Sequence, residues 1–131
     1  MFGFEKLEAW KEAVNYAGAV YSATKAFPSD ERFGLTSQLR RSAVSISANL
    51  AEGTSRATDK DFARFVEISY GSLMENISEA IVARELEFLS EKQLEDLNQR
   101  AEKIARMLSG LRSSLLKSKP STIDSQPSTS P

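Results

Sequence analysis

Apolar residues recur every three or four positions in four long segments, and this spacing constrains the fold more than any other feature of the chain. A period of 3.6 residues places such residues on one side of an α-helix, whereas a half-buried strand needs strict alternation. The segments predict helices over about 5–26, about 35–54, from Thr58 to 86–89, and from Ser90 to about Leu115. Joined by short links, they predict an all-α fold, an antiparallel up-down-up-down four-helix bundle over residues 1–117.

Each predicted helix has an apolar stripe that should face a shared core. In chain order, the four stripes are Leu7, Trp10, Val14, Ala17, Val20 and Tyr21; Leu35, Leu39, Ala43, Ile46 and Leu50; Phe62, Phe65, Val66, Leu73, Ile77, Ala80 and Ile81; and Leu94, Leu97, Ala101, Ile104, Leu108, Leu111 and Leu115. Trp10 is therefore predicted in the core, whereas Tyr16 falls off the stripe and is predicted to be exposed.

Capping residues mark the predicted helix ends. Thr58 with Asp61, and Ser90 with Gln93, have the spacing of N-terminal capping boxes. Gly53 stands where a helix C-terminal glycine is expected. Gly71 is small enough to allow a close approach between helices.

The composition argues against catalysis. The chain has no cysteine and no histidine, so it lacks the thiolate nucleophile, the side chain used most often for proton transfer near neutral pH, and the commonest metal ligand. Its serines have no accompanying base, and it has no glycine-rich phosphate loop. We therefore predict a protein that is not an enzyme and that uses no cofactor and no metal.

Composition also bears on the chain's ends and location. Residues 118–131 consist mostly of Ser, Thr and Pro with one large apolar residue, Ile123, and are predicted to form a disordered tail. No apolar run approaches the roughly 20 residues of a membrane helix, and the start lacks the features of a signal peptide. The expected location is cytoplasmic.

A polar stripe runs beside the apolar one in the second predicted helix, formed by Gln38, Arg41, Ser45, Asn49, Glu52 and Arg56. The third helix offers polar partners in Ser69, Ser72, Glu75, Asn76 and Glu79. One interpretation is a structural network that sets the register of these helices, with Gln38, Ser45, Asn49, Glu52, Ser72 and Glu75 as members. The alternatives are a solvated face and a binding groove or subunit contact.

Charge is balanced overall but unevenly distributed. Seventeen Lys and Arg against eighteen Asp and Glu give a formal net charge of −1. The candidate residues for binding nucleic acid or a partner are Arg40, Arg41, Arg56, Arg100, Lys103 and Arg106. An acidic block from Glu75 to Asp96 separates these two groups, which favours opposite-sign contacts between copies or with a basic partner.

Several blocks resemble the four-helix-bundle proteins encoded in intervening sequences of 23S ribosomal RNA genes. The most specific block is QLRRSAVSISANLAEG at 38–53. The resemblance extends over 4–115 and is carried further by FEKLEAW at 4–10, FPSDE at 27–31, FGL at 33–35, Phe62, Phe65, Ile68 and GSLME at 71–75. The tail beyond Lys119 departs from the family's usual pattern.

The resemblance implies a ring of five subunits, similar to the accessory variability protein of diversity-generating retroelements, which associates with a reverse transcriptase and nucleic acid. We expect a homo-oligomer whose combined basic surface engages RNA, DNA or a nucleic-acid enzyme. The alternative is a structural or adaptor bundle that binds another protein and uses its polar stripe for packing specificity.

Overall fold

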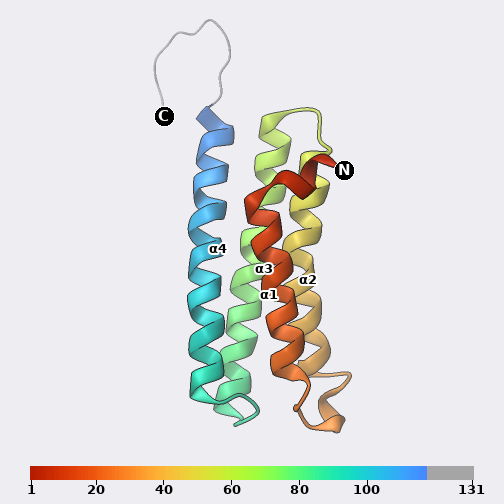
Figure 1. Ribbon diagram of the computed structural model, residues 1–131, viewed down its shortest axis with the longest axis vertical. Coiled ribbons are helices and arrows are strands. Elements are labelled where there is room, and N and C mark those ends of the chain that lie inside the picture. The colour runs from red at the N-terminus through yellow and green to blue at the C-terminus, as the bar shows by residue number, and fades with distance from the viewer. Residues whose placement is uncertain (118–131) are drawn as a thin grey trace, which may run out of the picture.

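The computed structural model describes residues 1–117, and its elements are four long helices and two short 3-10 helices. In chain order, these are η1 (Gly3–Lys6), α1 (Glu8–Thr24), η2 (Ser29–Glu31), α2 (Leu35–Thr54), α3 (Asp59–Glu85) and α4 (Glu91–Lys117). Successive long helices run in opposite directions (Figure 1), which confirms the predicted four-helix bundle. The predicted disorder of the tail, 118–131, lies outside the described residues.

The four helices occupy the corners of a square. α1 and α3 each pack closely against both α2 and α4, whereas α2 and α4 have no Cα atoms within 8 Å of one another and stand diagonally across the bundle (Figure 1). This order follows from short connections, which make each helix the neighbour of the next. No helix within residues 1–117 is both long and apolar enough to cross a membrane.

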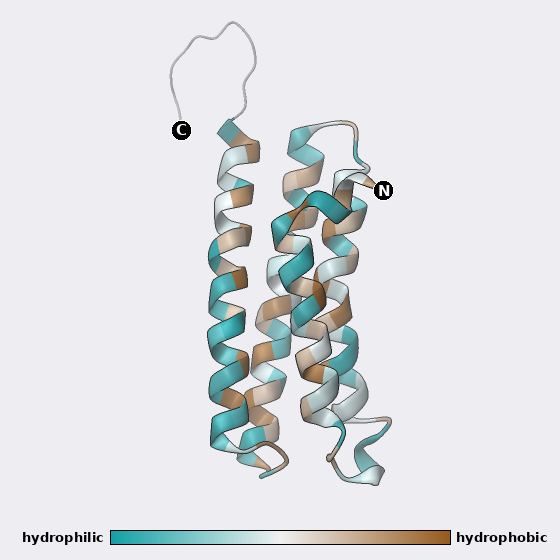
Figure 2. Ribbon diagram, in the orientation of Figure 1, coloured by the Kyte–Doolittle hydropathy of each residue, from teal (hydrophilic) through white to brown (hydrophobic). Residues whose placement is uncertain are grey.

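The core stripes predicted for α2 and α4 are confirmed. In α2, Leu39, Ala43, Ile46 and Leu50 are fully or almost fully buried, and in α4 the same holds for Leu97, Ala101, Ile104 and Leu108. The remaining stripe members, Leu35, Leu94, Leu111 and Leu115, are partly buried against this core. Figure 2 shows the consequence for α4, whose outer side is hydrophilic while its hydrophobic residues face the other helices.

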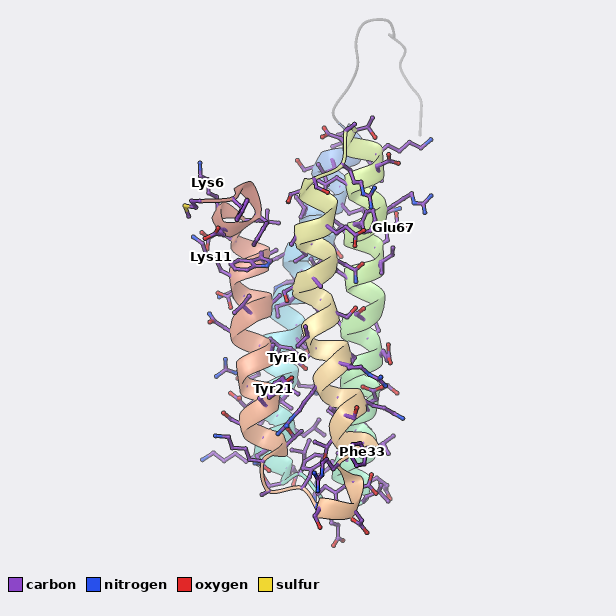
Figure 3. All side chains as sticks on the ribbon, turned by 90° about the vertical axis from the view of Figure 1, so that its right-hand side faces the viewer. Lys6, Lys11, Tyr16, Tyr21, Phe33 and Glu67 are labelled. Atoms are coloured by element: carbon purple, nitrogen blue, oxygen red, sulfur yellow. The ribbon has the colours of Figure 1, made fainter. Side chains whose placement is uncertain are left out.

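The predicted stripe of α1 is confirmed at Val20, which is buried, and in part at Leu7, Trp10 and Ala17, which are partly buried against the core. It is wrong at two positions. The buried residues are Ala9, Ala13, Tyr16, Val20 and Thr24, while Val14 and Tyr21 are exposed. Alanines at this face let α1 approach its neighbours, and Tyr16 fills the space between the helices (Figure 3). Tyr16 is buried, not exposed as predicted, because its hydroxyl finds a hydrogen-bond partner in the core. Trp10 is partly buried against the core, as expected.

In α3, the predicted stripe fails at one position. Val66, Leu73 and Ala80 are buried as expected, but Ile81 is 51% exposed. The helix has apolar residues on several sides, so its periodicity does not single out one face.

Both predicted capping boxes form at least in part. The Thr58 hydroxyl accepts from the Asp61 amide, and Ser90 and Gln93 exchange two hydrogen bonds at the start of α4. At the other end of α3, Glu87 adopts a left-handed conformation (φ 66°), which turns the chain toward α4.

Two predictions about glycines are wrong. Gly53 lies inside α2 and has no positive φ, so it is not a terminal cap. Its role is contact, because a Cβ there would stand 2.9 Å from the Cβ of Phe65. Gly71, by contrast, is exposed, and a Cβ at this position would have no heavy atom within 4 Å.

Candidate functional site

A chain of hydrogen bonds crosses the core and links three helices. The Tyr16 hydroxyl of α1 donates to Asn76 Oδ1 of α3 at 2.7 Å. Asn76 Nδ2 donates to the backbone oxygen of Leu39 at 2.8 Å and to Ser42 Oγ at 2.9 Å, both in α2. Ser42 in turn donates to Glu79 Oε1 at 2.8 Å, which brings the chain to the surface. Asn76 is completely buried, so these bonds satisfy a group that water cannot reach.

The carboxyl group at the end of this chain has a perturbed pKa. Partial burial raises the pKa of Glu79, and the neighbouring carboxylate of Glu75 raises it further, while the Ser42 hydrogen bond and the charge of Arg41 oppose the rise. Burial also raises the pKa of Tyr16 far above its usual range, so its hydroxyl remains a donor. Each group therefore acts as a structural hydrogen-bonding partner in this arrangement.

Part of the predicted polar stripe also forms hydrogen bonds, one of which joins α2 to α3. Ser45 and Ser72 join their hydroxyls at 2.9 Å, and Asn49 donates to Ser45 Oγ at 3.0 Å. Gln38, Glu52 and Glu75, which were grouped with them, are exposed on the outer surface. Glu52 pairs with Arg56 at 2.8 Å. The structure thus brings together three of the six predicted network residues.

Sequence reasoning missed Ser42 and Tyr16 as network members. Ser42 lies three residues after Leu39 and four before Ile46, and so it falls within the apolar stripe of α2. A polar residue at such a position requires a buried partner, which Asn76 supplies. The same signal was present for Tyr16, which lies three residues after Ala13 and four before Val20.

The predicted basic residues do not converge on one surface of a single chain. Arg40, Arg41 and Arg56 belong to α2, whereas Arg100, Lys103 and Arg106 belong to α4, and these helices are diagonal. Arg40 is further occupied within the bundle. Its Nε donates to Thr24 Oγ1 at 2.8 Å, and its guanidinium lies 4.5 Å from the centre of the Tyr21 ring.

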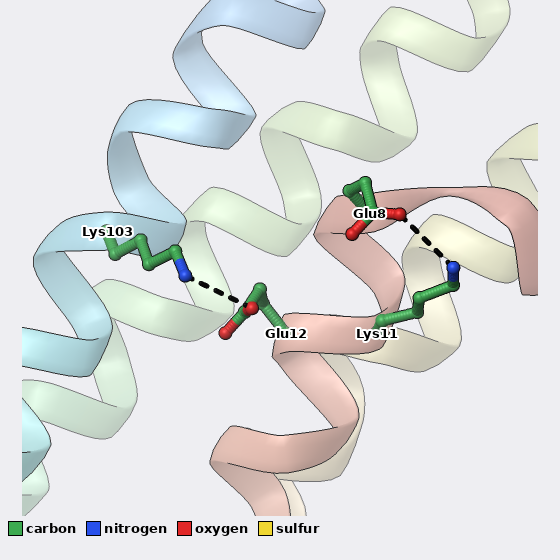
Figure 4. Close-up of polar contacts among 4 residues, drawn as sticks. All are labelled: Glu8, Lys11, Glu12 and Lys103. Atoms are coloured by element: carbon green, nitrogen blue, oxygen red, sulfur yellow. Dashed lines mark hydrogen bonds and ion pairs between the residues drawn. The ribbon is translucent and has the colours of Figure 1, made fainter.

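Ion pairs already engage half of these cations. Lys103 pairs with Glu12 of α1 at 3.2 Å, close to the Lys11–Glu8 pair (Figure 4). Arg100 pairs with Asp96, and Arg56 pairs with Glu52. Of the six predicted residues, Arg41 and Arg106 are exposed and form no ion pair with any of residues 1–117.

An exposed apolar stripe lies along the α3–α4 side of the bundle. Its members are Tyr70, Met74 and Ile81, which are 37%, 42% and 51% exposed. They are four and seven residues apart and therefore share one side of α3. Tyr70 also lines a groove of about 290 Å³ between α3 and α4, together with Val66, Leu108 and Ser109. We call Tyr70, Met74 and Ile81 the α3–α4 stripe.

A match to a protein-family model decides the chain's relationships. The model of the 23S rRNA-intervening sequence protein family matches residues 5–110. The chain belongs to this family. Within residues 1–117 of this family member, no group of three acidic side chains is placed to hold a metal ion.

A solved structure supports the fold assignment. The family member is similar to a protein of unknown function from the S23 ribosomal protein family of Bacteroides thetaiotaomicron, with a TM-score of 0.74 and 20% sequence identity. The similarity covers 80% of this chain and 95% of the other, and at this identity it shows a shared fold. A search of curated proteins gave no match.

Proposed function

We propose that the protein acts without catalysis, as a homo-oligomeric four-helix bundle that offers its assembled surface to a partner. The observation that carries this proposal is the exposed α3–α4 stripe. Three large apolar side chains on one side of a well-packed bundle are characteristic of a protein-binding surface. The family resemblance implies five copies in the assembly.

The mass in solution tests self-association. We expect sedimentation equilibrium at micromolar concentration to give a multiple of the single-chain mass. Met74→Glu and Ile81→Glu should each raise the dissociation constant by about tenfold or more, because a charge would have to be buried against apolar partners. Ser22→Glu, which adds the same charge to the exposed surface of α1, serves as the control and should leave the assembly unchanged. A wild-type protein of single-chain mass would contradict the proposal.

Nucleic-acid binding is a second candidate function, favoured by Arg106, which forms no ion pair within residues 1–117. Arg106 and Lys6 are exposed and border a groove of about 410 Å³ between α4 and the start of the chain. An assembly would repeat such cations around its surface, where their fields add. Through them, the assembly would hold RNA or DNA, or serve as an accessory to a nucleic-acid enzyme such as a reverse transcriptase.

Titration of labelled RNA and DNA at about 50 and 200 mM salt tests this second candidate. Arg106→Ala should weaken binding severalfold and reduce the salt slope by about one per chain, without changing the assembly mass. Arg100→Ala should have a smaller effect, because Asp96 already neutralises Arg100. Absence of binding at the lower salt concentration would rule the second candidate out.

A further inference from the structure

We propose that copies associate head-to-tail, with the outer side of α2 in one copy seated on the α3–α4 stripe of the next and Arg41 facing Glu102. This inference rests on the proposed self-association and adds the two surfaces and their pairing. The contact joins two different faces of the chain. Each copy can therefore bind one neighbour through the outer side of α2 and another through the α3–α4 stripe.

The receiving face combines an apolar centre with an acidic border. Beyond the α3–α4 stripe, the exposed Glu85 stands one helical turn after Ile81. In α4, Glu102 and Glu95 precede the groove residue Ser109 by two and four turns, on the same side of the helix. Arg112 also lines this groove, but its charge is paired with that of Glu67.

The acidic border disfavours two-fold pairing through this face. A symmetric dimer would place the α3–α4 stripe of one copy against the same stripe of its partner, and would bring the borders of like charge together. Contact between like charges weakens association, whereas contact between opposite charges strengthens it. A basic apolar face is therefore the better complement.

The outer side of α2 has these properties. Val44, which is 43% exposed, and Ala48 form a low apolar ridge, and Arg41 stands one turn before Val44. Val44 and Ala48 line a shallow depression of about 560 Å³. Tyr21 of α1 and Glu75 of α3 also line it. Small side chains here allow a helix of another copy to approach closely.

The two charged residues also lie at a similar height along the bundle. The Ser42–Glu79 hydrogen bond places Arg41 level with about Ala80 of α3. The Arg112–Glu67 pair places Glu102, ten residues earlier in the antiparallel α4, level with about Ile77. The offset of three residues is about 5 Å. Side-by-side copies would therefore bring Arg41 and Glu102 within reach of one another with little axial shift.

Arg41 and Glu102 are exposed on two helices that stand diagonally across the bundle, so contact between them would be intermolecular. Charge reversal of the full chain therefore tests the pairing. Arg41→Glu and Glu102→Arg should each raise the dissociation constant of the assembly about five- to tenfold, since reversal replaces attraction with repulsion. The double variant should return to within about threefold of wild type. A control pair, Arg41→Glu with Asp61→Arg at the far end of α3, has the same net charge and should remain weak.

Disulfide cross-linking provides a second measurement that does not depend on charge. The chain has no native cysteine, so Arg41→Cys combined with Glu102→Cys should give cross-linked species of three or more chains on oxidation. Each single variant should give no such ladder. Both positions are exposed, and circular dichroism should show wild-type helicity in every variant.

The outcomes separate this inference from the function on which it rests. A monomeric wild-type protein overturns self-association and with it the pairing. The head-to-tail pairing alone is overturned if the wild-type protein is oligomeric but the Arg41→Glu/Glu102→Arg variant assembles as weakly as the control pair. Cross-linking of a single-cysteine variant into dimers would also overturn it, because that result indicates a two-fold interface.

Discussion

Replacing Asn76 with alanine should lower the free energy of unfolding by about 3–5 kcal/mol, a large part of the 5–15 kcal/mol typical of a domain. Asn76 is completely buried and accepts from Tyr16 while donating to Leu39 and Ser42. Its removal leaves the Tyr16 hydroxyl without an acceptor and the Leu39 carbonyl without this donor, in a place that water does not enter. Urea denaturation followed by circular dichroism measures the loss.

Asn98→Ala is the matched control for this prediction. Asn98 is exposed on α4, and its replacement should change the free energy of unfolding by no more than about 0.5 kcal/mol. Combining Asn76→Ala with Tyr16→Phe should cost less than the sum of the two single changes, because the second change removes the hydroxyl that the first leaves unpaired. An Asn76→Ala loss below about 1 kcal/mol would show that the bond network contributes little.

The sequence predicts α2 and α4 best, since the apolar residues of each keep to one side and polar residues occupy the other. Prediction was poorer for α1 and α3 for two different reasons. In α1, three of the five buried residues are alanine or tyrosine, and the burial of Tyr16 depends on Asn76, which lies 60 residues away in the chain. In α3, apolar residues also occupy the outer surface, so Ile81 could not be separated from the core by spacing.

Candidate binding residues are harder to predict, because a charge is available only if nothing else in the fold engages it. Lys103 and Glu12 form an ion pair across α4 and α1, although 91 positions separate them in the chain. Arg40 stacks on Tyr21, and this leaves Arg41, its immediate neighbour, as the exposed cation. Amino-acid composition contains no information on such pairings, which arise from the packing of separate helices.

Gly53→Ala should destabilise the bundle by about 1–3 kcal/mol even though alanine favours helices over glycine by about 1 kcal/mol. The new Cβ would stand 2.8 Å from Cδ1 of Phe62 and 2.9 Å from Cβ of Phe65. The Phe62 ring can rotate away, but the Phe65 Cβ is attached to the backbone of α3, so relief requires the α2–α3 pair to separate. Thermal denaturation should therefore show a lower melting temperature.

Gly71→Ala tests whether packing contact or helix propensity decides if a glycine-to-alanine change stabilises or destabilises the protein. Gly71 is also within a helix, but a Cβ there would meet nothing within 4 Å, so the same substitution should stabilise the protein by about 0.5–1 kcal/mol. Opposite signs at the two positions would show that the missing side chain of Gly53 sets the spacing between α2 and α3. Stabilisation by both substitutions would mean that the two helices can separate at no cost, contrary to the close contact between Gly53 and Phe65.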